Sequence, residues 1–510
     1  DAIIYMPNPG SGGAEILTEI LTGKTNPSGR TVDTWTKDFL AMPTTKNFGF
    51  NGGNYSTLGN DAMVYKNVDR LNSTNKVPFV QYEEGIYLGY RYYETAFKEG
   101  VINYDNEVAF PFGHGLSYTT FTQEFVDKKV ENNKVKLSVK VTNTGSVAGK
   151  DAVQIYYGAP YTNFDKENGI EKSSKNLVAY DKSELIEPNK SQVINLEFNV
   201  EDMASYYYKR DNKDGTKGCY FLEKGDYSIY LGKNSHEEYE TWNYNNKNDI
   251  YYDNTNPRQS EKDGQSKLDK EGNPTNEAKN GGDFVAATNM FQSSSDFMNE
   301  EGITNLSRKD FKGTFPTTPT DADRTLKDIY KEEFDSYKSY VMDIKEHPVL
   351  GNQKGSKARD TRPFKVEQKD IPLSSMRGID YDDEKWEEFI NQISFRSQDN
   401  KDQIGKLLAY GAYNTGKLDA IGKFSTQEFD GPNGYSTFGL KKDWKWCTYA
   451  SQTITACTFN PRLAYQRGYN IGQEGLANGV QGLYDPGMNL HRSPFGGRNG
   501  EYVSEDPYIT

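Results

Sequence analysis

The spacing of hydrophobic residues changes along the chain and divides it into four stretches. In residues 122–234, apolar and polar positions alternate, as at Val135, Leu137, Val139 and Val141. A period of two predicts strands that bury one face. Because turn signals such as "TNTG" and "EKGD" separate these runs, the stretch predicts a small β-sandwich.

The N-terminal stretch, residues 1–121, mixes strand and helix patterns. The run "DAIIYM" predicts a strand, "PNPGSGG" a turn, and "AEILTEILTG" a helix that ends at Gly23. A sheet with flanking helices fits this order, so we expect an α/β domain.

The C-terminal stretch, residues 361–510, returns to alternating strands and helices. In "NPRLAYQRGYNIGQEGLANGV", Asn460 is a natural N-cap with Pro461 at the first helical position. The glycines of this helix would let one face approach a sheet closely; they are Gly468, Gly472 and Gly475. The next run, "QGLYDPGMNL", predicts a buried strand and its exit loop. This order predicts the opening units of a (β/α)8 barrel, whose chemistry lies on the loops after the strands.

The stretch between them, residues 235–360, is the most polar. Residues 235–283 have almost no periodic apolar pattern, which predicts a linker or a loose surface loop. Within 321–345, apolar residues at helical spacing predict one amphipathic helix with a core-facing stripe. The stripe consists of Leu326, Ile329, Tyr330, Phe334, Tyr337, Val341 and Ile344.

Composition and net charge limit the classes of molecule that the protein is expected to bind. The chain has 510 residues, 35% of them hydrophobic, and a net charge of -13. This charge repels polyanions, so neither a nucleic acid nor an anionic membrane is expected as a partner. No apolar run reaches the length of a membrane span, about 18 residues. A neutral ligand is favoured.

Metal and nucleotide sites are not expected either. The three cysteines, Cys219, Cys447 and Cys457, lie outside any CxxC pattern, and no HExxH spacing occurs, so no metal is predicted. Buried free thiols are favoured over a Cys447–Cys457 disulfide, which would require an exported protein. The "GKT" at 23–25 imitates a phosphate-binding loop, but that motif needs glycine where Thr18 stands.

Two loops hold the candidate chemistry. Asp430 lies in "EFDGPNG", where a plain turn is the simpler interpretation. In the closing "GGRNGEYVSEDP", Arg498 could offer its donors to hydroxyls, or it could form a buried salt bridge with Glu501. Glu505 and Asp506 are interpreted as structural, with Asp506 as the cap of a helix that starts at the following proline.

These motifs resemble those of a known family. "FDGPNG", "TACTFNPRLAYQRGYNIGQEGLANGV" and "DPGMNLHRSPFGGRNGEYVSEDP" look like the barrel of glycoside hydrolase family 3, whose best-known members are β-glucosidases. "DAIIYMPNPGSGGAEILTEILTGKTNPSGR", "YEEGIYLGYRYYET" and "FPFGHGLSYTTF" resemble its second, α/β sandwich domain. Residues 122–234 resemble the fibronectin type III-like domain that follows.

The resemblance implies a multidomain chain in an unusual order. A partial α/β sandwich domain and a fibronectin type III-like β-sandwich precede the first part of a (β/α)8 TIM-type barrel. "NLSRKDFKGTFPTTPTDADR" resembles the connector of bacterial β-glucosidases with this reversed order. The chain opens without an initiator methionine and lacks motifs of the later barrel strands, so truncation at both ends is expected.

The implied activity is that of a retaining exo-β-glycosidase without a cofactor. β-Glucosidase action on β-linked oligosaccharides or aryl β-glucosides is favoured, with β-xylosidase or β-N-acetylglucosaminidase as alternatives on the same fold. A homo-oligomer is compatible with the family. The compartment stays open between the cytoplasm, favoured by the lack of a visible export signal, and secretion.

The implied site is incomplete. Asp430 and Arg498 match residues that bind the sugar of the −1 subsite, but Tyr435 and Ser436 stand where many members have an apolar residue and an arginine. The family's "KH" pair and its nucleophile motif "SDW" do not occur, and its acid/base glutamate is expected upstream of Asp1. Glu83 and Glu84 lie in a segment that is structural in the family. The chain alone is therefore expected to be inactive; a non-catalytic carbohydrate-binding or broken product is the alternative.

Overall fold

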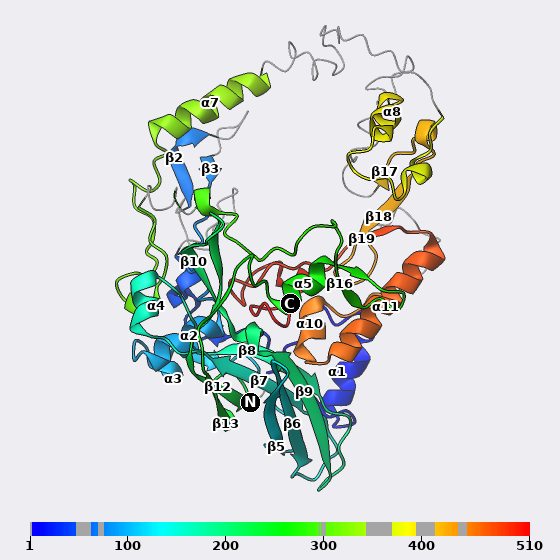
Figure 1. Ribbon diagram of the computed structural model, residues 1–510. Helices are drawn as coiled ribbons and strands as arrows, with labels where there is room; N and C mark the ends of the chain where they lie inside the picture. The colour runs from blue at the N-terminus through cyan, green and yellow to red at the C-terminus, as the bar shows by residue number, and fades with distance from the viewer. Residues whose placement is uncertain are drawn as a thin grey trace.

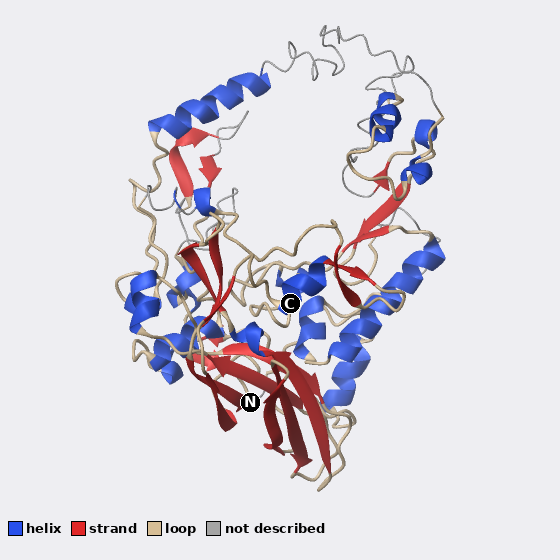
Figure 2. Cartoon of the chain, in the orientation of Figure 1, coloured by secondary structure: helices blue, strands red, loops and turns tan. Residues whose placement is uncertain are grey.

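The structure is a computed structural model that describes residues 3–46, 63–69, 76–294, 296, 302–342, 370–393, 414–436 and 446–510 (Figure 1). Figure 2 shows many of the strands gathered in one large unit, with helices and loops on its flanks. Within the described ranges, no helix is both long and apolar enough to cross a membrane.

The large unit is a β-sandwich of two antiparallel sheets. One sheet has the order β5-β6-β9 and the other the order β13-β12-β7-β8. Their strands are β5 (Phe121–Glu131), β6 (Lys134–Asn143), β7 (Ala152–Gly158), β8 (Asn176–Lys182), β9 (Ser191–Asn199), β12 (Gly225–Gly232) and β13 (Glu238–Asn246).

The predicted alternation within the sandwich is confirmed. Val135, Leu137, Val139 and Val141 of β6 are all buried in a core shared with the opposite sheet. Val139 lies opposite Ile194 of β9, which belongs to the same core. Alternation of this kind places one face of each sheet against the other.

The prediction that residues 235–283 form a linker or loose loop is wrong. This segment contains β13, β14 (Ile250–Tyr252), α5 (Gln259–Gln265) and the hairpin β15 (Ser266–Leu268)–β16 (Pro274–Ala278). β13 pairs along β12, where Tyr244 lies opposite Tyr227 and Trp242 opposite Ile229. Its aromatic residues pack against the sandwich core, but the polar residues between them hide this pattern in the sequence. β14 joins β10 (Ser205–Asp211) and β11 (Lys217–Leu222) in a small sheet.

The N-terminal part confirms its predicted helix but not its predicted strand. α1 (Gly13–Leu21) is followed by Gly23 at a φ of 74°. Lys24 and Thr25 both bind the side chain of Glu19, so they belong to the end of this helix. Residues 3–6 form no strand, and Ile3 is 79% exposed. The other elements are α2 (Tyr90–Lys98), α3 (Tyr104–Glu107) and the pairs β1 (Trp35–Thr36)–β4 (Val108–Phe110) and β2 (Val64–Asp69)–β3 (Lys76–Pro78).

One hydrophobic cluster joins the N-terminal part, the sandwich and the C-terminal part. It contains Tyr90 of α2, Tyr156 of β7, and Phe459 and Ile509 from the end of the chain. The rings of Tyr90 and Tyr156 meet edge to face, with centroids 5.9 Å apart. The three parts therefore bury a common surface.

The connector before α7 (Asp328–Met342) docks through Arg308. Its guanidinium donates to Glu99 at 2.7 and 2.8 Å and to the carbonyl of Lys172 at 2.9 Å, which links α2 to the sandwich part. The helix predicted over 321–345 begins later, at Asp328, because Thr320 and Asp323 close a turn before it.

The predicted core-facing stripe of this helix is only partly correct. Tyr330 and Phe334 are half-buried, whereas Ile329 is 69% exposed. Ile344 lies outside the described residues.

The described residues of the C-terminal part include a strand–helix–strand unit. β18 (Thr426–Asp430) and β19 (Gly482–Tyr484) are parallel neighbours, joined by α10 (Gln452–Cys457) and α11 (Pro461–Asn478). β17 (Asn414–Thr415) pairs with β18, and α8 (Lys385–Asn391) lies before it in the chain. β19 is half-buried rather than buried as predicted.

The predicted start of α11 is confirmed. The side chain of Asn460 accepts a hydrogen bond from Leu463 N, and Pro461 opens the helix. Of the three glycines, only Gly475 closely approaches another segment, and that segment is the turn after β18 rather than a strand; a Cβ there would lie 2.1 Å from the hydroxyl of Tyr435. Gly468 and Gly472 have no such neighbour within 4 Å, so the prediction is wrong for these two.

Replacing Val139 with alanine is expected to lower the free energy of unfolding by about 2 kcal/mol, because two buried methyl groups are lost. Val193→Ala is the matched control, since Val193 on β9 is 51% exposed; its expected cost is below about 0.5 kcal/mol. Chemical denaturation followed by circular dichroism measures both values. Equal losses would contradict the sandwich core described above.

Candidate functional site

The candidate site lies at the carboxyl ends of the parallel strands β18 and β19. Asp430 is the last residue of β18 and lies opposite Tyr484. Its carbonyl accepts a hydrogen bond from Ser436 N at 2.7 Å, which closes the turn that follows. Within this turn, Gly434 has a φ of 93°, a conformation that favours glycine.

Alternation along β18 puts its two carboxylates on one face. Glu428 and Asp430 are two residues apart, while Phe429 between them is buried on the other face, in a cluster with Ile471 of α11. The hydroxyl of Tyr484 donates to Glu428 at 3.3 Å. The face turned away from α11 is therefore polar.

Arg467 of α11 supports the turn after Asp430. Its Nη2 donates to the carbonyl of Pro432 at 2.6 Å, and its Nη1 lies 3.5 Å from Asp485. Burial raises the pKa of Asp485, and the Arg467 guanidinium opposes this shift. Arg467 thus connects the loops that follow the two strands.

Arg498 lies in the loop after β19. It forms a two-point ion pair with Glu501, with Nε–Oε1 at 2.8 Å and Nη2–Oε2 at 2.5 Å. The predicted alternative of a buried salt bridge is wrong about burial, because the Arg498 side chain is 74% exposed. Hydrogen bonding to Glu501 raises the pKa of Arg498, with a smaller contribution from Asp430. Asp430 and Arg498 are therefore within electrostatic range of each other.

Arg492 anchors this loop to the N-terminal part. Its guanidinium donates to Glu84 at 2.5 and 2.9 Å and lies over the ring of Tyr82 at 4.5 Å. Its carbonyl accepts from Thr44 Oγ1 at 2.8 Å. This contact gives Glu84 a structural role, as expected for its segment.

Glu505 and Asp506 are buried beneath α2. Glu505 accepts hydrogen bonds from Thr34 N, Thr34 Oγ1 and Tyr90 N at 2.7–2.8 Å. Gly89, at a φ of 54°, leaves the necessary space, since a Cβ there would lie 2.0 Å from Glu505 Cδ. The hydroxyl of Tyr90 donates to Asp506 at 2.7 Å. The structural role expected for both carboxylates fits these contacts.

Asp506 caps a turn rather than the predicted helix. Its Oδ1 accepts from Tyr508 N at 2.9 Å and from Ile509 N at 3.0 Å. These residues form a turn and not a described helix.

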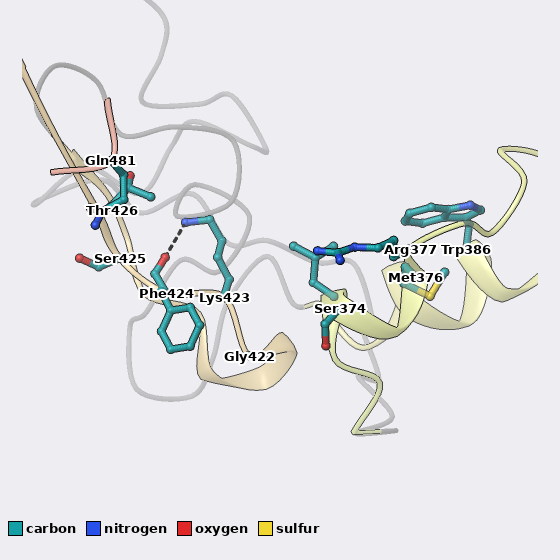
Figure 3. A pocket seen from close by; sticks show the side chains of 11 residues that line it. Ser374, Met376, Arg377, Trp386, Gly422, Lys423, Phe424, Ser425, Thr426 and Gln481 are labelled. Atoms are coloured by element: carbon teal, nitrogen blue, oxygen red, sulfur yellow. Dashed lines mark hydrogen bonds between the residues drawn. The ribbon is translucent and has the colours of Figure 1, made fainter. Parts of the chain in front are cut away.

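A pocket lies at the other end of these strands (Figure 3). It has a volume of about 740 Å³ and reaches Ser425, Thr426 and Gln481, at the amino ends of β18 and β19. Asp430 ends β18 on the opposite side, so this pocket is separate from the candidate site. Lys423 on its wall is already bound to Thr415 Oγ1 and the carbonyl of Gly416. The remaining lining residues are Leu373, Ser374, Met376, Arg377, Trp386, Gly422 and Phe424.

Potential metal ligands and the three cysteines also lie among the described residues. Nowhere in these ranges do three or more His, Cys, Asp or Glu side chains form a group that could hold a metal ion. The three cysteines are free. Cys219 is buried, but Cys447 is exposed, so the predicted burial is wrong for that thiol.

Sequence reasoning singled out Asp430 and Arg498 but missed the residues that support them. No local sequence pattern marks Arg467, Asp33 or His491 as functional, because their partners are distant in the sequence. The strings "NPRLAYQRGYN" and "NLHRSPFGGRN" contain Arg467 and His491, so closer attention to the polar residues within those motifs could have found both.

Comparison with known proteins identifies relatives of this arrangement. No family model matches the chain. A β-glucosidase A from Butyrivibrio fibrisolvens is 27% identical over 98% of this chain and 52% of its own length. A β-glucosidase from Ruminococcus albus is 27% identical over 100% of this chain and 43% of its own length. The chain thus spans about half the length of the curated relatives it matches.

A solved structure gives the same result. The crystal structure of a β-glucosidase from Paenibacillus barengoltzii superposes with a TM-score of 0.58 at 25% identity, covering 98% of this chain and 44% of that chain. The chain is therefore a multidomain α/β protein that is similar over its length to β-glucosidases.

Glu84→Gln is expected to cost about 3 kcal/mol of stability, because it removes the buried carboxylate that accepts two hydrogen bonds from the Arg492 guanidinium. The double variant Glu84→Gln/Arg492→Gln should be less destabilised than the sum of the single variants. Urea denaturation of all four proteins measures this coupling. Additive costs would mean that the two charges do not depend on each other.

Glu505 is expected to make stability fall as the pH rises. Burial, followed by repulsion from Asp33, raises the pKa of Glu505 from 4.5 to about 8. Between these values the unfolded chain has released the proton that the folded chain keeps, so unfolding becomes easier toward high pH. Below the unfolded pKa this penalty is absent.

Denaturation at several pH values between about 5 and 8 tests this dependence. Glu505→Gln should flatten it, even if the absolute stability falls. The exposed Glu124→Gln is the control and should keep the slope of the parent chain. An unchanged slope in Glu505→Gln would contradict the assignment.

Proposed function

We propose that this chain is part of a retaining exo-β-glycosidase of the glycoside hydrolase family 3 type. The favoured substrates are terminal non-reducing β-D-glucosyl residues of β-linked oligosaccharides and aryl β-glucosides. One observation carries the proposal: Asp430 ends a parallel strand within electrostatic range of Arg498, in a chain that is similar over its length to β-glucosidases.

Asp430 and Arg498 have the chemistry to bind a neutral sugar. A carboxylate accepts hydrogen bonds from hydroxyls, and a guanidinium donates them. Hydrogen bonds with a charged partner are about twice as strong as neutral ones. The ion pair between Arg498 and Glu501 is exposed, so a sugar can replace part of it at small cost.

The reaction requires two further carboxylates. In a retaining enzyme one attacks the anomeric carbon to form a glycosyl-enzyme, and the other protonates the leaving oxygen and then activates water, at a separation of about 5 Å. The strings "KH" and "SDW" do not occur in the sequence. In our proposal this chain supplies sugar-binding residues, and the longer protein supplies the catalytic carboxylates. No cofactor takes part.

The proposed domain order is the reversed one. An α/β sandwich part (1–121) and a fibronectin type III-like β-sandwich come first, and the start of a (β/α)8 barrel (361–510) follows the connector. A single alignment with the Butyrivibrio relative over 98% of the chain supports this order. β13 extends the sandwich beyond residue 234, to Asn246.

The identity of the sugar stays open within the proposal. Tyr435 and Ser436 follow Gly434, where many members of the family have an apolar residue and an arginine. This difference keeps xylose and N-acetylglucosamine as alternatives on the same fold.

Asp430→Asn is expected to weaken binding of D-glucose to the chain at least tenfold, because a charged acceptor is replaced by a neutral amide of the same shape. Saturation-transfer NMR titration measures the affinity. Asp419→Asn is the matched control, since Asp419 is an exposed aspartate of the same part of the chain. Equal affinities in all three proteins would remove Asp430 from the site.

The longer protein that contains this chain is expected to hydrolyse an aryl β-D-glucoside with retention of configuration. Release of nitrophenol from the glucoside, the xyloside and the N-acetylglucosaminide, compared by kcat/KM, ranks the three sugars. Lack of activity on all three would contradict the proposed function.

A further inference from the structure

His491 is enclosed between the N-terminal part and the turn that follows Arg498. Its Nδ1 lies 2.8 Å from Asp33 Oδ1 and 3.0 Å from Oδ2. Its Nε2 lies 3.1 Å from the backbone carbonyl of Asn499. The side chain of His491 is fully buried and that of Asp33 is 2% exposed, so water does not replace either contact.

Both partners of the ring accept hydrogen bonds and donate none. A carbonyl oxygen has no proton to give, and an ionised carboxylate has none either. Neutral imidazole has one donor nitrogen and one acceptor nitrogen, so one ring nitrogen would face an acceptor without a proton between them. Such a buried mismatch is costly. With Asp33 ionised, only the doubly protonated ring satisfies both contacts.

Groups on three neighbouring segments face the Asp33–His491 pair. Glu505, Tyr5 and Cys457 all interact electrostatically with Asp33, and the ring of Tyr502 lies 6.5 Å from that of His491. Burial raises the pKa of Cys457 to about 12. Burial and the nearby Asp33 raise the pKa of Glu505 to about 8.

The carbonyl held by His491 belongs to the residue directly after Arg498. It also accepts from Thr453 Oγ1 at 2.8 Å and from Tyr502 N at 3.0 Å. The side chain of Asn499 donates to the carbonyl of Ser493 at 2.8 Å. These contacts fix the short helical turn Asn499–Glu501, and with it the point from which Arg498 extends.

We propose that His491 is a positioning residue, which Asp33 holds as a buried imidazolium and which fixes the turn that presents Arg498 to the sugar. The role in sugar binding rests on the proposed function of Arg498. The protonation of the ring and the order of the turn do not depend on it.

The first test is the protonation state of the ring. His491 is one of four histidines, so NMR of chain labelled with ¹⁵N-histidine resolves it, and His491→Gln assigns its signal. At a pH of about 8, where an ordinary histidine is neutral, both ring nitrogens of His491 should carry protons. In Asp33→Asn the ring should lose one of them. A singly protonated ring in the parent chain would overturn the proposal.

The second test couples His491 to Arg498. His491→Gln should weaken D-glucose binding about tenfold, the size of one lost hydrogen bond to a charged group. In the Arg498→Ala chain, the same change should have no further effect. An equal loss with and without Arg498 would indicate a general structural role and would overturn the proposal.

His236→Gln is the matched control for this test. His236 also pairs through Nδ1 with a carboxylate, Glu94, at 3.1 Å, but it does not contact the turn after Arg498. Its loss should leave both the affinity for glucose and the order of the turn unchanged.

If the parent chain binds no glucose, that result contradicts the proposed function and not the role of His491. A third measurement then tests the role of His491 without glucose. Amide hydrogen exchange of Glu501 and Tyr502 reports on the turn directly. Exchange about tenfold faster in His491→Gln, but not in His236→Gln, supports the positioning role. Unchanged exchange would overturn it.

Discussion

The arrangement of the molecule depends on burying two adjacent carboxylates, Glu505 and Asp506, beneath α2. A carboxylate inside a protein is tolerated only when its oxygens find hydrogen-bond donors. Thr34 and Tyr90 supply them from the N-terminal part. These donors come together only when the N-terminal part is docked against the C-terminal stretch in the observed orientation. Burial of the two carboxylates therefore favours this orientation.

The geometry of the candidate site depends on how the C-terminal stretch packs against the N-terminal part. Asp430 belongs to a strand–helix–strand unit and is supported from within it by Arg467. Arg498 lies on a loop whose anchors, Glu84 and Asp33, belong to the N-terminal part. The two sugar-binding candidates are thus held by different parts of the molecule. Their relative position is set where those parts meet, and a change far from the sugar can alter it.

Local signals predicted the elements that depend on local physics. The Asn460–Pro461 start of α11, the stop after α1 and the alternation of β6 each follow from a few neighbouring residues. The sequence did not predict β13, because this strand is stabilised by pairing with β12. Residues 3–6 were expected to form a strand but pair with no neighbouring strand among the described residues. Asp430 and Arg498 could be named from their motifs. Arg467 and His491 lie within those motifs too, but their roles depend on partners that only folding brings close.

The separation of Asp33 from His491 has a consequence for synthesis. The two residues are 458 positions apart, so a ribosome makes Asp33 long before its partner exists. Until the last residues of this stretch emerge, Tyr90 and Val32 lack the apolar neighbours Phe459 and Ile509 of their cluster. The β-sandwich can close earlier, from contacts within its own segment. The N-terminal part therefore completes its apolar cluster only after Ile509 is made, and apolar surface that stays uncovered during synthesis favours aggregation of nascent chains.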